Sequence, residues 1–261
     1  MGRDPLKNTI KVYRKRLWTG WPVFDRLVEL RPGILINVFS TPGIGKSSWA
    51  MNLMKRVTDP DINRQPQGVL YVTLDTPLTT QAQRWWCLNT ETPIDIVSKT
   101  PNLYRGKTDR LRQGHGWIEW CDTAISIYDL ADLLKAVKEF AGSYPSLLIV
   151  DVVKDLLVDG TYEEFSTTFK LLKEYSMAAK ISVVSLHHAT KSVEPTKPLL
   201  LRQVEYAGDK QPDVVLGMYS RDEIDVVMSV LKNRSGAMSP TGAIRTRFRP
   251  DWERGGVWVQ R

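Results

Sequence analysis

The sequence contains few cysteines and histidines and no long apolar run. Its two cysteines, Cys87 and Cys121, are far apart, and the chain has only three histidines. This pattern argues against a zinc site and against a disulfide scaffold. No stretch of about 18 apolar residues is present, and no apolar segment follows the charges at the start of the chain. We therefore expect a cytoplasmic protein with neither a membrane span nor a secretory signal.

Composition and charge set broad limits. Hydrophobic residues make up 42% of the 261 positions, which is enough for one substantial core. The net charge of +7 gathers at the ends: residues 1–18 hold six basic side chains against one acid, and residues 232–261 hold seven against two. Basic ends fit a polyanionic partner such as nucleic acid, and they fit solubility equally well. Charge alone does not distinguish a nucleic-acid partner from a role in solubility.

Apolar runs that alternate with helical periods predict an α/β fold. We expect buried strands at 34–39, 69–74, 147–151 and 181–186, and helices at 47–54, 79–88, 130–141 and 162–180. Strand-like segments without intervening helices follow at 214–219, 226–231, 243–248 and 257–259. This order predicts a mostly parallel central sheet flanked by helices, with antiparallel strands added at the C-terminal side. Residues 89–116 are polar without a clear period, and we interpret them as a surface insertion.

A glycine-rich turn between the first strand and its helix is typical of a phosphate loop. In such a loop, inward-pointing N–H groups and the helix N-terminus hold the phosphates of a nucleoside triphosphate. Lys46 would reach the β- and γ-phosphates, and Ser47 would ligate Mg²⁺. The alternative is a chance strand-to-helix turn. Ser40 replaces the first glycine of the usual motif, so its backbone must tolerate a Cβ. The predicted nucleotide-binding residues are Ser40, Thr41, Pro42, Gly43, Ile44, Gly45, Lys46, Ser47 and Ser48.

A carboxylate at the end of another buried strand is expected to organise the magnesium ion. The run 147–151 ends in Asp151, which is the candidate. A helix N-cap after a strand is the alternative role for this aspartate. No glutamate follows Asp151 directly, because Val152 and Val153 come next. The catalytic base must therefore come from elsewhere in the chain.

Several separated segments, in this order, resemble the RecA-like ATPase core of replicative DNA helicases of the DnaB type. They are the phosphate loop, the run ending in Asp151, and residues 18–27, 72–75, 183–188, 207–215 and 230–236. The resemblance covers nearly all of residues 18–249. It implies a RecA-like ATPase domain over 18–261, preceded by a basic N-terminal arm or linker at 1–17. It also implies ATP and Mg²⁺ as cofactors and a ring, most often a hexamer, on single-stranded DNA, with other replication proteins as further candidate partners.

The resemblance assigns roles to residues outside the phosphate loop. Asp75 takes the position of the glutamate that polarises the attacking water, although it is one methylene shorter. His187 fits the place of the γ-phosphate-sensing residue best, with His188 behind it. Lys232 and Arg234 take the positions of a Lys and an Arg finger that reach the γ-phosphate bound by the adjacent subunit.

The loop after the histidines is the predicted DNA-binding segment. Basic side chains and loop N–H groups suit single-strand phosphates, whereas an ordinary solvated loop is the alternative, because acids partly offset the charge. The predicted DNA-binding residues are Lys191, Lys197, Arg202 and Lys210.

Two further functions stay open at this point. The first is an ATP-switched DNA-binding or helicase-accessory module with little hydrolysis, which the short side chain of Asp75 motivates. The second is a recombinase of the RecA type, which would form open filaments rather than closed rings.

Overall fold

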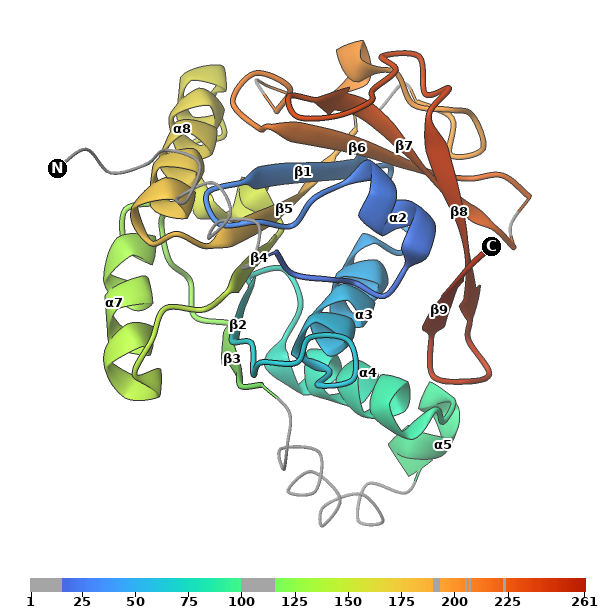
Figure 1. Cartoon of the computed structure of the whole chain (residues 1–261), viewed down its shortest axis with the longest axis horizontal. Coiled ribbons are helices and arrows are strands. Elements are labelled where there is room, and N and C mark those ends of the chain that lie inside the picture. The colour runs from blue at the N-terminus through green and yellow to red at the C-terminus, as the bar shows by residue number, and fades with distance from the viewer. Residues whose placement is uncertain (1–15, 100–115, 190–192, 205, 207, 223) are drawn as a thin grey trace, which may run out of the picture.

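A nine-stranded sheet forms the centre of the molecule (Figure 1). The computed structural model describes residues 16–99, 116–189, 193–204, 206, 208–222 and 224–261. The strands are β1 (Leu35–Ser40), β2 (Val69–Thr73), β3 (Ile118–Cys121), β4 (Leu147–Asp151), β5 (Ser182–His188), β6 (Val214–Ser220), β7 (Val226–Asn233), β8 (Arg245–Asp251) and β9 (Val257–Gln260). The helices are α2 (Pro22–Leu27), α3 (Lys46–Thr58), α4 (Leu78–Thr90), α5 (Ile94–Lys99), α7 (Leu130–Ala141) and α8 (Tyr162–Ala178), with short 3-10 turns η2 (Val153–Leu156) and η3 (Leu201–Gln203).

The sheet is parallel over most of its width. Its strand order is β3-β2-β4-β5-β1-β6-β7-β8-β9. The strands from β3 to β6 in this order run parallel, and β7, β8 and β9 are antiparallel to their neighbours. The predicted fold class is confirmed. Several short elements were not expected: helix α2, the 3-10 turns, the edge strand β3, and helix α5 inside the segment interpreted as a surface insertion.

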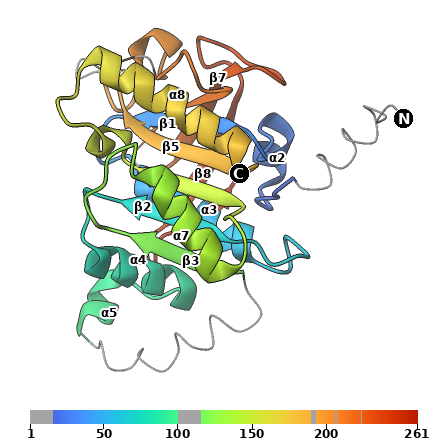
Figure 2. The same cartoon turned by 90° about the vertical axis from the view of Figure 1, so that its left-hand side faces the viewer.

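Helices cover both faces of the sheet because the central strands of the parallel part are buried on both sides. Helix α3 packs on one face in a cluster that includes Trp49 and Leu53. Helices α7 and α8 pack on the other face, where Leu134 and Phe169 are buried (Figure 2). All residues of β1, β2 and β4 are buried. The continuous apolar runs of the sequence therefore lie in the middle layer of three.

Aromatic rings join the antiparallel end of the sheet to α3. Trp21 stacks on Trp49 at 6.2 Å between ring centroids and meets Phe248 of β8 edge-on at 5.0 Å. Phe248 in turn lies 5.9 Å from Trp258 of β9. All four rings are almost fully buried. This packing folds the β8–β9 hairpin back against the helix that begins at the phosphate loop.

The parallel strands bring the predicted site residues to one edge. Ser40 ends β1, Asp151 ends β4, and Asp75 follows the end of β2. Carboxyl ends of parallel strands form the usual ligand-binding edge of such sheets. Of the predicted N-terminal arm, residues 1–15 lie outside the described residues. Leu17, at the end of the arm, is buried and bridges Leu30.

Candidate active site

The segment between β1 and α3 has the backbone geometry of an anion-binding loop. Gly43 and Gly45 have positive φ angles of 83° and 98°, which residues with a Cβ rarely adopt. Helix α3 begins after Gly45 without a side-chain cap, so its first N–H groups are open to a ligand at the pocket. Ser40 is the last residue of the buried strand β1 and is not among the residues with positive φ. A side chain is therefore tolerated where the usual motif has glycine.

Lys46 extends over the loop and is largely buried. Its Nζ donates to Ser40 Oγ at 3.0 Å, to Ser40 O at 3.3 Å and to Thr41 O at 3.4 Å. Burial lowers the pKa of Lys46 from 10.5 to about 8, and the nearby charge of Asp151 opposes this change. The negative charge of Asp151 therefore does not fully offset the cost of burying the Lys46 ammonium group. A phosphate in the loop would supply further negative charge.

Asp151 is held below the loop by two hydroxyl groups. Tyr71 Oη donates to Asp151 Oδ2 at 2.7 Å, and the Ser47 hydroxyl also hydrogen-bonds this carboxylate. Burial raises the pKa of Asp151, while both hydrogen bonds and the charge of Lys46 act in the other direction. Ser47 and Asp151 thus form a hydroxyl–carboxylate pair beside the phosphate loop. This donor set fits Mg²⁺, which is usually bound through one or two carboxylates together with substrate phosphates.

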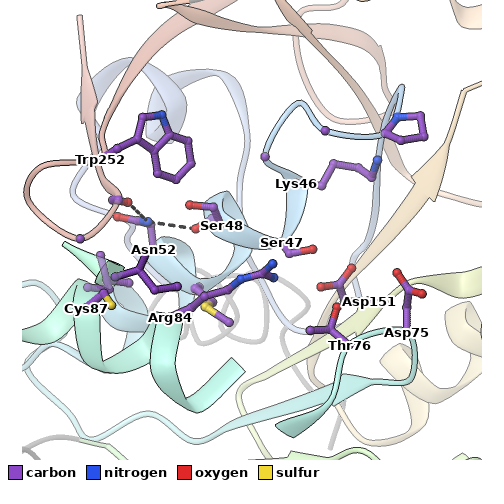
Figure 3. Close-up of a pocket in the computed structure, with 18 of the residues that line it drawn as sticks. Lys46, Ser47, Ser48, Asn52, Asp75, Thr76, Arg84, Cys87, Asp151 and Trp252 are labelled. Carbon is purple, nitrogen blue, oxygen red and sulfur yellow. Dashed lines mark hydrogen bonds between the residues drawn. The ribbon is translucent and has the colours of Figure 1, made fainter. Parts of the chain in front are cut away.

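Asp75 shares the cavity with Asp151. Both residues line a pocket of about 480 Å³ that also includes the phosphate loop. Figure 3 shows the two carboxylates on the same side of the pocket, near Lys46 and Ser47. The charge of Asp75 contributes to raising the pKa of Asp151, so the two groups interact. Unlike Asp151, Asp75 is exposed, and its carboxylate can hold a water molecule.

The two consecutive histidines at the end of β5 point in opposite directions. His187 is 1% exposed, and its ring lies 5.2 Å from Phe165 and 5.6 Å from Phe169 of α8. His188 lines the nucleotide-sized pocket, and burial together with the charges of Lys46 and Lys154 lowers its pKa. Its Nδ1 is buried and has no hydrogen-bond partner within the described residues. His188 is therefore the histidine that lines the pocket, whereas His187 packs against α8, and the γ-phosphate-sensing role stays a prediction for either residue.

Two residues that line the pocket, Arg84 and Trp252, were not predicted from the sequence. Arg84 projects from α4, and Figure 3 shows its guanidinium directed toward Ser47. Trp252, from the turn between β8 and β9, lines the end of the pocket away from Asp75 and Asp151 (Figure 3), and it is 60% exposed. No local signal marks these residues, because α4 and the hairpin reach the pocket only through the tertiary fold.

Asn52 of α3 holds the hairpin in this position. Its Nδ2 donates to Gly256 O at 2.9 Å, and its Oδ1 accepts from Trp258 N at 2.9 Å. Trp258 Nε1 donates to Ser48 Oγ at 3.0 Å. Gly255 approaches α4 so closely that a Cβ would lie 1.9 Å from the carbonyl oxygen of Cys87. Only glycine allows this approach.

Lys232 and Arg234 lie at the opposite edge of the sheet from the phosphate loop. Arg234 N donates to Asp213 O at 2.9 Å, and Leu35, the first residue of β1, donates to the Asp213 carboxylate at 2.9 Å. Lys232 Nζ donates to the carbonyl oxygens of Asp209 and Lys210, while Arg234, 51% exposed, lies 3.6 Å from Asp213 Oδ1. Within one chain, neither basic residue belongs to the pocket of Lys46.

The predicted DNA-binding residues are spread along the segment between β5 and β6. Lys191 lies outside the described residues. Lys197 is exposed and pairs with Glu194 at 2.8 Å, and Arg202 is exposed in η3. The Lys210 ammonium contacts the hydroxyl and the ring of Tyr162 at the start of α8. These side chains contact different elements rather than one another.

Two other kinds of site are absent from the described part of the chain. No group of three or more histidine, cysteine or acidic side chains is arranged to hold a metal ion there. No helix in the same residues has the length and apolar character of a membrane span.

The fold is shared with solved helicase ATPase domains, while no protein-family model and no curated protein matches the chain. One of these structures, an isolated ATPase domain, superposes with a TM-score of 0.78 at 15% identity, covering 99% of both chains. A DnaB-like replicative helicase, solved in a study of its interactions with primase, superposes with a TM-score of 0.76 at 14% identity, covering 98% of this chain and 66% of that one. This chain therefore has the RecA-like fold that is found in the ATPase domains of DnaB-like helicases.

Proposed function

We propose that this chain is an ATP-hydrolysing DNA helicase motor that assembles into a ring, a hexamer, around single-stranded DNA and translocates along it. The observation that carries the proposal is the separation of two groups of charged residues. Lys46, Asp151 and Asp75 gather at one edge of the sheet, and Lys232 and Arg234 lie at the other. In a head-to-tail ring, one edge of each subunit faces the opposite edge of its neighbour. Each interface would then complete one active site.

The residues at the loop edge would divide the chemistry among them. Lys46 and the first N–H groups of α3 bind the β- and γ-phosphates, and Ser47 with Asp151 holds the magnesium ion. Asp75 orients and polarises the attacking water. Because its side chain is short, the water must lie close to the end of β2. His188 contacts the γ-phosphate and couples the presence or loss of that phosphate to the β5–β6 loop.

The hairpin end of the pocket suits the base of the nucleotide. The indole ring of Trp252 offers a face for stacking, which is tolerant of base identity. Arg84 carries a permanent positive charge toward the phosphates from the other side. ATP is the nucleotide that the resemblance to DnaB-type helicases favours.

A mixing experiment tests the shared site. Lys46→Ala and Arg234→Ala are each expected to remove DNA-stimulated ATP hydrolysis, the first by removing the phosphate clamp and the second by removing the finger. A 1:1 mixture is expected to recover about one quarter of the wild-type rate, because random assembly in a heterologous ring pairs an intact loop with an intact finger at that frequency. Arg64→Ala, an exposed arginine outside both groups, is the control and keeps full activity.

The mixture separates the proposal from its rivals. If the mixture stays inactive while both variants still assemble, Arg234 does not act across an interface. A wild-type chain that assembles with ATP but shows no turnover on single-stranded DNA would support the accessory module, which the aspartate at position 75 favours. Particle images that show open filaments instead of closed rings would support a recombinase.

A further inference from the structure

A second cavity, remote from the phosphate loop, is lined by arginines. It has a volume of about 520 Å³ and lies on the antiparallel part of the sheet. Arg245 and Arg247 of β8 line it, together with Arg221, which follows β6, and Arg261, which follows β9. No carboxylate is among the described residues that line it. The cavity therefore combines four positive charges with an open volume.

The strand geometry explains why these arginines share one face. Side chains alternate along β8, so Arg245 and Arg247 point away from Phe248, which packs in the aromatic cluster on the α3 side. Arg245 and Arg247 are exposed, whereas Thr246 and Phe248 are buried. The arginines therefore project from the face that is not covered by α3.

Two of the arginines are held in place by Tyr219 of β6 and by Asp225, which directly precedes β7. Arg245 Nη1 donates to Tyr219 Oη at 3.2 Å. Arg247 Nη1 lies 3.7 Å from Asp225 Oδ2, and Arg249 Nε donates to Asp225 Oδ1 at 2.8 Å. Asp225 is 4% exposed and is shared by two guanidinium groups, so it does not neutralise both. A guanidinium has five N–H donors, and most of those on Arg245 and Arg247 are not used by these contacts.

The cavity adjoins the segment that is predicted to bind DNA. Thr196 and Pro198 line it, and Lys197 stands between them in the chain. Ser220 N donates to Pro195 O at 2.9 Å, which fixes this part of the segment against the end of β6. The same segment starts after His188, which lines the nucleotide pocket. Contacts in the arginine cavity are therefore connected to the nucleotide pocket through a short stretch of chain.

We propose that the arginine cavity binds consecutive phosphates of single-stranded DNA. Planar guanidinium groups with several donors match phosphate oxygens better than ammonium groups do. The contacts would go to the backbone and would carry no sequence preference. The inference rests on the proposed function only for the identity of the polyanion. It adds a second contact region, on β8, to the loop residues Lys197 and Lys210.

Binding of a fluorescein-labelled oligothymidine tests the site. Affinity is measured by anisotropy over a range of salt concentrations, with a nonhydrolysable ATP analogue and Mg²⁺ present. Arg245→Ala combined with Arg247→Ala is expected to weaken binding by roughly tenfold for each arginine lost. The slope of log K against log salt should fall by about 1.4, since each phosphate contact on a single strand contributes about 0.7.

A matched control removes the same charge elsewhere. Arg64→Ala combined with Lys135→Ala takes two exposed positive charges from a loop and from α7, outside the cavity. It is expected to leave both affinity and salt slope close to wild type. Equal losses in the two double variants would overturn the inference, because only net charge would then matter. A loss in the cavity variant that is accompanied by loss of assembly, measured by light scattering, would also overturn it.

The outcome also separates this inference from the proposed function. If wild type binds the oligonucleotide and Lys197→Ala with Lys210→Ala weakens binding while the cavity variant does not, the arginine cavity is excluded and the motor proposal stands. If wild type hydrolyses ATP but does not bind the oligonucleotide at any salt concentration, both the cavity and the DNA motor are refuted.

Discussion

Lys46 makes the stability of the protein depend on pH in a direction that can be worked out in advance. Its pKa is about 8 in the folded chain and near 10.5 when the chain unfolds, because folding buries the ammonium group. Between these two values the unfolded state binds more protons, so stability rises with pH. Replacing Lys46 with methionine removes this titration and keeps an unbranched side chain that is one atom shorter.

The size of the effect follows from the two pKa values. Taking pKa values of 8 and 10.5, the free energy of unfolding of wild type should rise by about 2.5 kcal/mol relative to Lys46→Met between pH 7 and pH 10. Differences in packing between lysine and methionine are present at every pH, so they shift the difference without changing its slope. All other titrating groups are common to the two proteins and largely cancel.

Urea unfolding followed by tryptophan fluorescence provides the measurement. Both proteins are unfolded at pH 7, 8, 9 and 10, and the difference in free energy is plotted against pH. Adding ATP and Mg²⁺ should flatten the plot for wild type, because phosphate oxygens beside Lys46 raise its pKa. A difference that stays constant with pH, or falls as pH rises, would refute the burial argument.

Three further predictions concern the surroundings of the site. Tyr71→Phe removes a hydrogen bond to the Asp151 carboxylate and raises its pKa further, so the acid limb of the pH–rate profile of ATP hydrolysis should move to higher pH; Tyr128→Phe, an exposed tyrosine, should leave it in place. His188→Ala should lower kcat with little change in melting temperature, whereas His187→Ala, which empties a packed site, should cost about 2–4 kcal/mol of stability; the reverse pattern would reject the assignment. Asn52→Ala leaves two buried backbone groups without partners and should cost about 2–4 kcal/mol and raise the KM for ATP; an unchanged KM would show that the hairpin does not shape the pocket.

The sequence predicted the parts of the fold that depend on local pattern. Strand β4 is a continuous apolar run and β1 is interrupted only by Asn37, and their carboxyl ends carry Asp151 and Ser40 as expected. The short strand β3 has four half-buried residues at the edge of the sheet and no apolar run, so no pattern marks it. Helix α5, of six residues with one buried side chain, was missed for the same reason.

The choice between the two histidines required the tertiary structure. Strand β5 is buried on both faces up to His187, so no alternation of polar and apolar residues indicates which face is which. Only the packing of Phe165 and Phe169 of α8 on one face identifies His187 as a core residue. The sequence predicted that the histidines lie at the end of β5, but it did not predict toward which face each of their side chains points.

The attachment of the β8–β9 hairpin to α3 affects the order in which the pocket forms during synthesis. Ser40, Lys46 and Asp151 are all present once the first 151 residues have left the ribosome, whereas Trp252 and the Trp258 contact to Ser48 come about 100 residues later. At a translation rate of roughly 5–20 residues per second, this is a delay of about 5–20 s. During that interval a nascent chain has its phosphate loop but no wall for the base. Nucleotide binding by the finished pocket would then favour the chain in which the hairpin has docked.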